Sequence, residues 1–429
     1  MTQYLRTKPA RFFLVFSLVS LILYCLSSIV TLRTALAEER SIRFWHWWNS
    51  AGEVKNIEVL NKYLTKNNLV WEEQAAQHSS SNLYLTRVKK QLQSQLPDAA
   101  MMDSSETHKY AESFNLLPLD DIAQEQNWDE VIPLAIQERA KHQGHWVSAP
   151  LNSHSTNWLW INKDLFLRLN ISEPQTWNDL IAMLDKAKAL GIPALASMRD
   201  DWEQALLFEL TLMSTGGLGF YRRLFFDQVL HPSDRSIVAK SLLRLKQLTS
   251  YYSDTTDNLS WDQSTAQLAK GNVLVQVHGS WVNSELSSLD AEANIDYMCL
   301  RFPETQGAYI FNSDHVVFFK APYNDGSAQK KLARILLDKD FQRELSIANG
   351  ASPARVDITT EGFNHCSKKS IYDLRMANMR RAVMPSINNK ALEKAVASFL
   401  QQHTSLRTAV EQVLHATLEE IQSPPSKSS

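Results

Sequence analysis

Strand-like and helix-like segments alternate along the N-terminal part of the chain, and this order limits the possible folds more than any other feature. Residues 42–46 alternate like a β-strand, and residues 53–67 carry apolar side chains at helical spacing. A second strand is predicted at 69–71, a helix at 83–96 and a third strand at 97–102. A β-α-β-α-β order implies a parallel sheet with helices on its faces. The sequence therefore predicts an α/β fold.

Later segments predict a second α/β unit and two passages between the units. The aromatic run 145–161 is expected to leave the first sheet and enter a second one, and 308–319 is expected to cross back. The length of 429 residues also favours two domains. Further helices and strands are expected at Thr176–Ala187 (which opens with a capping box), Glu203–Met213 (which ends at Gly216-Gly217), 237–248, 263–270, 273–277 and 297–302.

Residues 1–37 have the order of a secretory signal. Arg6, Lys8 and Arg11 precede an uncharged stretch at 12–32, and Ala35-Leu36-Ala37 precedes the first acidic residues. The alternative is a retained membrane anchor, because the uncharged stretch is long enough to span a bilayer. Removing residues 1–37, which carry four basic and no acidic side chains, would change the net charge from −2 to −6. We therefore expect an exported, periplasmic protein.

Charge and cysteine content narrow the partners and the compartment. Lys and Arg number 44 against 46 Asp and Glu, with no basic cluster, so nucleic acid is not an expected partner. The small net charge fits a neutral ligand. Cys299 and Cys366 are the two cysteines that remain after the signal, and an oxidising compartment favours a disulfide between them. Two free buried thiols are the alternative.

Sequence motifs for catalysis, metal binding and cofactor binding are missing. The chain has no G-x-S-x-G, no H-E-x-x-H, no P-loop and no Cys-x-x-Cys. Gly216-Gly217-Leu218-Gly219 follows a predicted helix rather than a strand, which is typical of a helix C-cap. An unmarked pair of carboxylates for glycoside hydrolysis stays open as an alternative. We expect a protein that is not an enzyme and needs no cofactor or metal.

The most informative side chains are tryptophans at predicted strand ends. Trp47 and Trp48 follow the first strand, Trp281 follows the strand at 273–277, and Trp261 precedes the helix that leads to that strand. Ligands of open α/β sheets bind outside the carboxyl ends of the strands. Indole faces at such an edge suit the C–H faces of a sugar ring. We expect these four at a ligand crevice, whereas Trp71, Trp128 and Trp177 are expected in the core.

The chain also resembles a known family, the periplasmic solute-binding proteins of carbohydrate ABC transporters, in particular the glucose/mannose-binding branch. The resemblance runs in order through nearly all of the chain after residue 37. It rests on His46-Trp47-Trp48 with Gly52-Glu53, 151–163, Thr176-Trp177, 201–204, 207–209, Gly279-Ser280-Trp281, 303–307, 311–314 and 350–355.

This resemblance implies a two-lobed periplasmic-binding-protein-like fold with a hinge and a ligand cleft between the lobes. Lobe 1 would comprise 38–155 and also receive roughly 312–350, and lobe 2 would comprise 156–311. Residues 351–429 would form C-terminal helices spanning the lobes, with a disordered tail at 422–429. Some family members carry a disulfide where Cys299 and Cys366 stand.

The resemblance also assigns roles in the cleft. Trp47 and Trp48 would stack on or flank the sugar, and Glu53 would accept its hydroxyls, while Trp261 and Trp281 would line the opposing lobe. Asp314 would take two hydroxyls. The full set of expected ligand contacts is Trp47, Trp48, Glu53, Met101, Asp103, His154, Trp261, Trp281, Asp314, Asn349 and Asn389.

Several of these positions depart from the family pattern. Met101 and Asp103 stand where sugar binders usually have Gln and Lys, Asn349 replaces a usual Lys, and Asn389 replaces a usual His. Each lost hydrogen bond to a buried hydroxyl costs about 1–3 kcal/mol. The stacking residues are therefore kept while the polar contacts are changed, which predicts a ligand other than plain glucose or a weak affinity.

Three functions follow from this reading. The first is a monomeric receptor that captures a small neutral carbohydrate and delivers it to inner-membrane ABC permease subunits. The second is a sugar-binding protein that signals to a membrane receptor. The third is a carbohydrate-active enzyme. The sequence favours the first.

Overall fold

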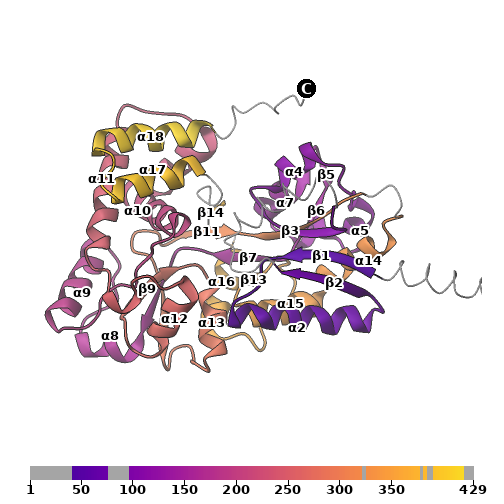
Figure 1. The fold of residues 1–429 in the computed structure, drawn as a ribbon, viewed down its shortest axis with the longest axis horizontal. Coiled ribbons are helices and arrows are strands. Elements are labelled where there is room, and N and C mark those ends of the chain that lie inside the picture. The colour runs from indigo at the N-terminus through magenta and orange to yellow at the C-terminus, as the bar shows by residue number, and fades with distance from the viewer. Residues whose placement is uncertain (1–40, 76–95, 321–324, 377–379, 384–389, 420–429) are drawn as a thin grey trace, which may run out of the picture.

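A computed structural model describes residues 41–75, 96–320, 325–376, 380–383 and 390–419. The expected signal at 1–37, most of the expected helix at 83–96, and the tail from 422 onward lie outside the described residues. Within the described ranges, no helix is both long and apolar enough to cross a membrane. The chain forms two α/β lobes that lie side by side, with β7, β11 and β14 between them (Figure 1).

Lobe 1 is built on a five-stranded sheet in the order β2-β1-β3-β12-β6. Strand β1 runs parallel to β2 and β3, which confirms the parallel sheet predicted for the N-terminal part of the chain. Strand β12 is inserted antiparallel between β3 and β6. The strands are β1 (Ser41–His46), β2 (Val70–Ala75), β3 (Ala99–Asp103), β6 (Ser148–Pro150) and β12 (Asp314–Phe318).

Helices on this sheet come from two distant parts of the chain. Helix α2 packs against α15, and their apolar faces meet the sheet in one core that includes Phe44, Leu60 and Leu345. The helices of lobe 1 are α2 (Ala51–Lys66), α4 (Thr107–Ser113), α5 (Asp120–Glu125), α6 (Trp128–Val131), α7 (Leu134–Ala140), α14 (Ser327–Leu336) and α15 (Lys339–Asn349), and β4 (Lys141–His142) pairs with β5 (His145–Trp146).

Two antiparallel strands carry the chain between the lobes. Strand β7 (Asn152–Ser155) leaves lobe 1, and β11 (Ala308–Asn312) returns to it, with Phe311 opposite Ser155 and Asn312 opposite His154. Two further strands complete this central sheet in the order β13-β7-β11-β14. They are β13 (Ser352–Pro353) and β14 (Arg380–Val383). Ser313 lies between β11 and β12 and belongs to neither, so the predicted single strand 308–319 is two strands.

Lobe 2 surrounds a three-stranded antiparallel sheet in the order β10-β8-β9. The strands are β8 (Trp158–Asn162), β9 (Val275–His278) and β10 (Tyr297–Arg301). The helices are α8 (Lys163–Leu169), α9 (Trp177–Ala189), α10 (Asp201–Arg222), η1 (Arg223–Asp227), α11 (Asp234–Thr249), η2 (Asp254–Thr256), α12 (Trp261–Ala269), α13 (Val282–Ser288), α17 (Lys390–Leu400) and α18 (Leu406–Glu419).

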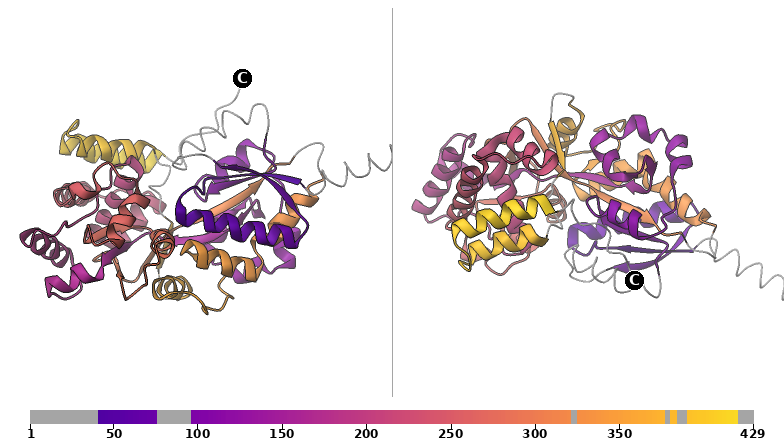
Figure 2. Two further views of the ribbon diagram at one scale, coloured as in Figure 1. Left: turned by 60° about the horizontal axis from the view of Figure 1, so that its bottom comes forward. Right: turned by 90° about the horizontal axis from the view of Figure 1, so that it is seen from above.

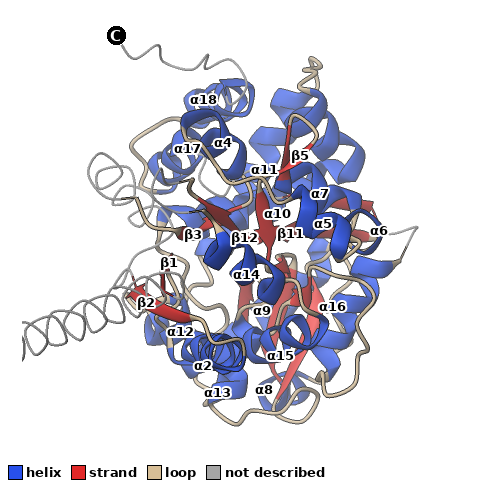
Figure 3. Cartoon of the chain, turned by 90° about the vertical axis from the view of Figure 1, so that its right-hand side faces the viewer, coloured by secondary structure: helices blue, strands red, loops and turns tan. Residues whose placement is uncertain are grey.

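The C-terminal helices have different places. Helices α17 and α18 lie against α10 and α11 and share the lobe-2 core through Val396 and Val413 (Figure 2). Helix α16 (His365–Arg375) instead touches both lobes, because Cys366 packs in a lobe-2 cluster and Leu374 in the lobe-1 core. The view along the molecule shows α16 beside the strands that join the lobes (Figure 3).

Two local predictions have clear outcomes. The predicted capping box at Thr176 is present, because its side chain accepts from Asp179 N and the Asp179 carboxylate accepts from Thr176 N. The helix predicted to end at Gly216-Gly217 instead continues as α10 to Arg222, with a break at Gly217, whose φ of 76° is not helical. Glycine adopts this φ without steric cost, so Gly217 marks a break within the helix and not its predicted end.

Candidate functional site

Polar side chains gather where the lobe-1 strands end beside the crossing strands. Asp103 is the last residue of β3 and Asp314 the first of β12, and the antiparallel register places them directly opposite each other. Both are buried, with exposed fractions of 2% and 5%. Trp47 follows β1 at the same edge and is partly exposed. The strand pairing therefore brings two of the expected ligand contacts, Asp103 and Asp314, together at one strand edge.

The two carboxylates have different hydrogen-bond partners. Asp314 Oδ2 accepts from Asn152 Nδ2 at 2.8 Å, and the Asp314 amide donates to Asn152 Oδ1 at 3.1 Å. Asp103 Oδ1 accepts from the Ser105 amide at 2.8 Å. Burial, with smaller contributions from the charges of Asp314 and Glu106, raises the pKa of Asp103 to about 7 against the opposing effect of the Ser105 hydrogen bonds.

His154 connects the hinge to both lobes. It belongs to β7, its Nε2 lies 3.4 Å from Asp314 Oδ2 in lobe 1, and its Nδ1 lies 3.1 Å from Ser280 Oγ in lobe 2. Its ring also meets Trp281 edge-on, with 5.5 Å between the ring centroids. Because His154 contacts both lobes from the hinge strand, these contacts would change when a ligand draws the lobes together.

Lobe 2 presents an aromatic cluster, which we define as Trp202, Trp261, His278 and Trp281. His278 is fully buried at the end of β9, and its ring lies 5.1 Å from Trp281, 5.3 Å from Trp202 and 5.8 Å from Trp261. The three tryptophans are partly exposed. Partly exposed indoles held by a buried ring form a fixed apolar surface that a flat ligand can cover.

A direct contact between the lobes lies beside this cluster. Glu285 of α13 accepts from the Ser50 hydroxyl and from the Gly52 amide of α2, the latter at 2.9 Å. A Cβ on Gly52 would lie 2.5 Å from Glu285 Oε1 and 2.9 Å from the Ser284 carbonyl carbon. The approach of α13 thus requires glycine at position 52. We call this the α2–α13 contact, and it shows that the two lobes meet at this edge.

The remaining predicted ligand residues are placed differently. Trp48 is 2% exposed and packs in the lobe-1 core near His46, so the expectation that it avoids the core is wrong. Met101 is fully buried in the same core, because β3 alternates its side chains and Met101 faces inward with Ala99. A direct contact of Met101 with ligand is inconsistent with this position.

Glu53 and Asn349 have structural partners. Glu53 Oε2 accepts from the Asn49 and Ser50 amides at 3.1 Å each, which completes the capping box of α2. Asn349 is 4% exposed at the end of α15, and its Oδ1 accepts from the Ala351 amide at 2.9 Å. Asn389 lies outside the described residues. Of the tryptophans expected in the core, Trp128 and Trp177 are buried, while Trp71 is partly exposed.

Sequence reasoning missed Trp202, His278 and Glu285. A signal for Trp202 exists, because residues 194–196 run parallel beside β9 and α10 begins a few residues later. Trp202 therefore follows a parallel segment, as Trp281 does, and the strand-end rule applies to both. His278 ends a buried strand and resembles a core residue in sequence. Glu285 is identified only by the packing of α13 on α2.

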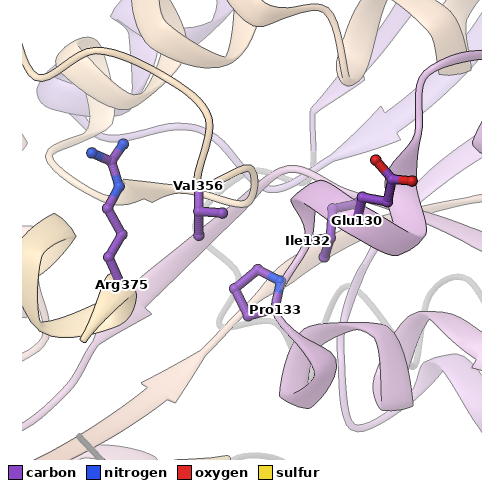
Figure 4. A pocket seen from close by; sticks show the side chains of 5 residues that line it. All are labelled: Glu130, Ile132, Pro133, Val356 and Arg375. Atoms are coloured by element: carbon purple, nitrogen blue, oxygen red, sulfur yellow. The ribbon is translucent and has the colours of Figure 1, made fainter. Parts of the chain in front are cut away.

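The described residues hold no metal-binding group, and a separate cavity is lined by other residues. Among the described residues, no group of three or more His, Cys, Asp or Glu side chains is arranged to hold a metal ion. A cavity of about 350 Å³ opens between the α6–α7 connection and the segment after β13 (Figure 4). It is lined by Glu130, Ile132, Pro133, Val356 and Arg375. None of these belongs to the aromatic cluster or to the strand ends that carry Asp103 and Asp314.

One predicted covalent link is present. Cys299 of β10 is bonded to Cys366 of α16, which confirms the predicted disulfide. It fastens the helix that touches both lobes to lobe 2.

Comparisons with known proteins agree with this architecture. Residues 59–331 match the model of the bacterial extracellular solute-binding protein family. A probable sugar-binding periplasmic protein of Mesorhizobium japonicum is 34% identical over 80% of this chain and 82% of its own. A protein of Rhizobium meliloti with the same description is 31% identical over 84% of this chain and 87% of its own.

Solved structures show the same fold at low identity. The solute receptor AcbH, described as having an exclusive preference for β-D-galactopyranose, superposes with a TM-score of 0.74 at 17% identity, covering 89% of this chain and 98% of its own. An ABC transporter solute-binding protein of Thermotoga lettingae bound to α-D-tagatose gives 0.72 at 16% identity, covering 89% and 99%. The family consists of binding proteins rather than enzymes, as the sequence predicted. This chain is a member of the bacterial extracellular solute-binding protein family.

Proposed function

We propose that this protein is the sugar-binding component of an ABC transport system, which captures a mono- or small oligosaccharide and delivers it to a membrane permease. The observation that carries the proposal is the aromatic cluster of lobe 2 beside the carboxylates and His154 of the hinge. The descriptions of the relatives as probable sugar-binding periplasmic proteins support it. We further propose that the protein works as a monomer in the periplasm.

The chemistry of a sugar accounts for both halves of the site. The C–H faces of a pyranose ring are apolar and pack on indole rings, while its hydroxyls need acceptors and donors once they leave water. In our proposal, Trp281, Trp202 and Trp261 supply the packing surface. Asp314, His154 and Trp47 face the ligand from the hinge and lobe 1. The permease then recognises the closed form of the two lobes.

The test is a titration of intrinsic tryptophan fluorescence with a panel of monosaccharides and short oligosaccharides. At least one sugar should give a saturable change. Replacing Trp281 with Ala should weaken the binding of that sugar by about tenfold to a hundredfold, since ring packing is lost. Trp281→Phe should weaken the binding less. Calorimetry on the same variants separates loss of binding from loss of a fluorescent reporter.

Flat calorimetric traces for every sugar with the wild-type protein would contradict the proposal. Transport is tested separately, by adding the sugar-loaded protein to vesicles that contain its permease and measuring ATP hydrolysis. Sugar binding without any stimulated ATP hydrolysis would leave the signalling alternative as the better account.

A further inference from the structure

The two carboxylates at the strand ends form an unusual pair. Asp103 and Asp314 are opposite residues of adjacent antiparallel strands, where Cβ atoms lie about 5 Å apart. Like charges in this arrangement repel each other, and both side chains are almost completely removed from water. Such a pair needs either a proton or a cation to be stable.

The described residues do not supply that cation as a Lys or Arg. No Lys or Arg side chain among the described residues is within ion-pair distance of either carboxylate, and the basic side chains near Asp314 are His154, at 3.4 Å, and the buried neighbour His315. The neighbouring Glu106 adds a further negative charge and pairs with Lys109 at 3.0 Å. The facing lobe contributes indole rings, and its Glu285 lies at the start of α2. The local charge is therefore negative, although the net charge of the chain is small.

Buried polar atoms next to the pair point to a ligand independently of the charges. The Ser104 amide donates to the Ser313 carbonyl at 3.0 Å, which places Ser104 in the same strand pair. Its hydroxyl is buried and has no hydrogen-bond partner in the described chain. The same holds for Thr107 Oγ1, in the segment that follows Asp103. Buried polar atoms are normally paired, so these atoms are suited to a polar ligand.

The cation that fits is organic rather than metallic. Two carboxylates and a histidine already bound to Ser280 do not form a metal-binding group within the described residues. An ammonium group, by contrast, donates three hydrogen bonds and neutralises one of two facing carboxylates. Burial and the neighbouring acids also raise the pKa of Asp103 to about 7, so a bound cation, which stabilises the charged carboxylate, would cause this group to release its proton to solvent near neutral pH.

We propose that the ligand is an amino sugar whose protonated amine is held between Asp103 and Asp314 while its ring packs on the aromatic cluster. This inference rests on the proposed function and narrows its substrate class. It also replaces the neutral ligand expected from the net charge. The net charge averages over the whole surface, whereas selectivity is decided by the charges that face the ligand.

The first test needs only the wild-type protein. Calorimetric titrations near neutral pH compare three matched sets: glucosamine, galactosamine and mannosamine, each with its N-acetyl form and its parent hexose. At least one amine should bind with at least about tenfold higher affinity than both of its neutral partners. Rising salt should weaken the binding of the amine alone. EDTA should have no effect.

Substitutions then locate the selectivity. Asp103→Asn should reduce the amine-to-hexose affinity ratio by about tenfold, because it removes one charge with little change of shape. Glu58→Gln is the matched control, since Glu58 is exposed on α2 of the same lobe and the change removes the same charge from the surface. This control should leave the ratio unchanged.

The outcomes separate the two proposals. Neutral sugars that bind as well as or better than their amines would overturn the amino-sugar inference and leave sugar binding intact. An unchanged ratio in Asp103→Asn would also overturn it. If no carbohydrate of either kind binds, the proposed function itself fails.

Discussion

At the scale of single residues, burial decides what each polar group can do. Asp103 and Asp314 have nearly the same exposure, yet Asp314 accepts from the Asn152 amide group and lies next to His154, while Asp103 accepts from a backbone amide. Ionisation of a buried carboxylate costs more free energy when few hydrogen bonds or opposite charges stabilise the charged form. Burial, with smaller contributions from the charges of Asp314 and Glu106, raises the pKa of Asp103 to about 7, and this shift couples folding to pH.

We predict that Asp103 destabilises the unliganded protein at alkaline pH. The folded state keeps the Asp103 proton up to about pH 7, whereas the unfolded state loses it near pH 3.8. The folded state thus binds more protons between these values, so the free energy of unfolding falls as pH rises through this window. The shift of about 3 units corresponds to at most about 4 kcal/mol. The groups facing Asp103 are Asp314, Glu106 and, through Asp314, His154.

Urea unfolding of Asp103→Asn tests this. The variant should be more stable than the wild type at pH 8, and the difference should shrink towards zero near pH 4. Glu58→Gln should show no such trend. An equal difference at both pH values would assign the effect to something other than the ionisation of Asp103.

The tryptophans show how far single residues could be predicted. Trp47, Trp261 and Trp281 are partly exposed at strand or helix ends, as expected for a crevice. Trp48 was mispredicted because the turn after β1 directs its ring into the lobe-1 core, and sequence alone does not give that turn. Trp202 was missed because its parallel segment pairs with β9 only through an isolated bridge, and the proline and alanines of 193–196 do not favour a strand.

At the scale of elements, the α2–α13 contact is the point where one helix limits the position of another. Ser50 and Gly52 begin α2, and their donors meet Glu285 of α13. Negative side chains are favourable at a helix N-terminus, because unpaired amides and the helix dipole attract them. A carboxylate from one lobe therefore caps a helix of the other, and this interaction exists only when the lobes are together.

We predict that Gly52→Ala weakens ligand binding by about tenfold without comparable loss of stability. The new methyl group would meet backbone of Ser284, which cannot rotate away, so α13 must move back from α2. The substitution also favours the helix by about 1 kcal/mol, which opposes any general destabilisation. Calorimetry measures the affinity and thermal unfolding measures the stability.

Gly219→Ala is the matched control, because it makes the same change in α10 and its Cβ would have no neighbour within 4 Å. It should bind ligand like the wild type. Wild-type affinity in Gly52→Ala would show that closure does not depend on the α2–α13 contact.

The order of elements was predictable in part. The alternation of strand and helix signals identified β1, α2, β2 and β3 and their parallel pairing, because apolar periodicity is local. The insertion of β12 between β3 and β6 could not be predicted in this way, since pairing of residues more than 150 positions apart leaves no local pattern. The site depends on that pairing, because it alone brings Asp314 to Asp103.

At the scale of the whole molecule, the disulfide covalently joins the lobe-2 sheet to α16, a helix that packs against both lobes. Cys299 lies in the lobe-2 sheet, and Cys366 begins a helix whose other end reaches the lobe-1 core. Arg301 strengthens the same junction, since it pairs with Asp373 of α16 and donates to Ser155 of the crossing strand at 2.6 Å. The helix is therefore held at the hinge by one covalent and several polar links.

We predict that the double substitution of Cys299 and Cys366 by Ser lowers the free energy of unfolding by about 4 kcal/mol. The bridge closes a loop with a sequence separation of 67 residues, and the loss of that constraint increases the entropy of the unfolded chain. Urea unfolding measures the difference. A reductant should lower the stability of the wild type by a similar amount and leave the double variant unchanged; an unaffected wild type would mean that the bond does not form in solution.

Neither lobe is continuous in the sequence, and this has a consequence for how the protein is made. The lobe-1 sheet lacks its inner strand β12 until residue 318 has been synthesised, and the lobe-2 core lacks Val396 and Val413 until the last helices appear. A nascent chain shorter than that has no complete core to fold around. Neither lobe can therefore complete its core until a late part of the polypeptide has left the ribosome, so we expect folding to finish after synthesis rather than lobe by lobe during it.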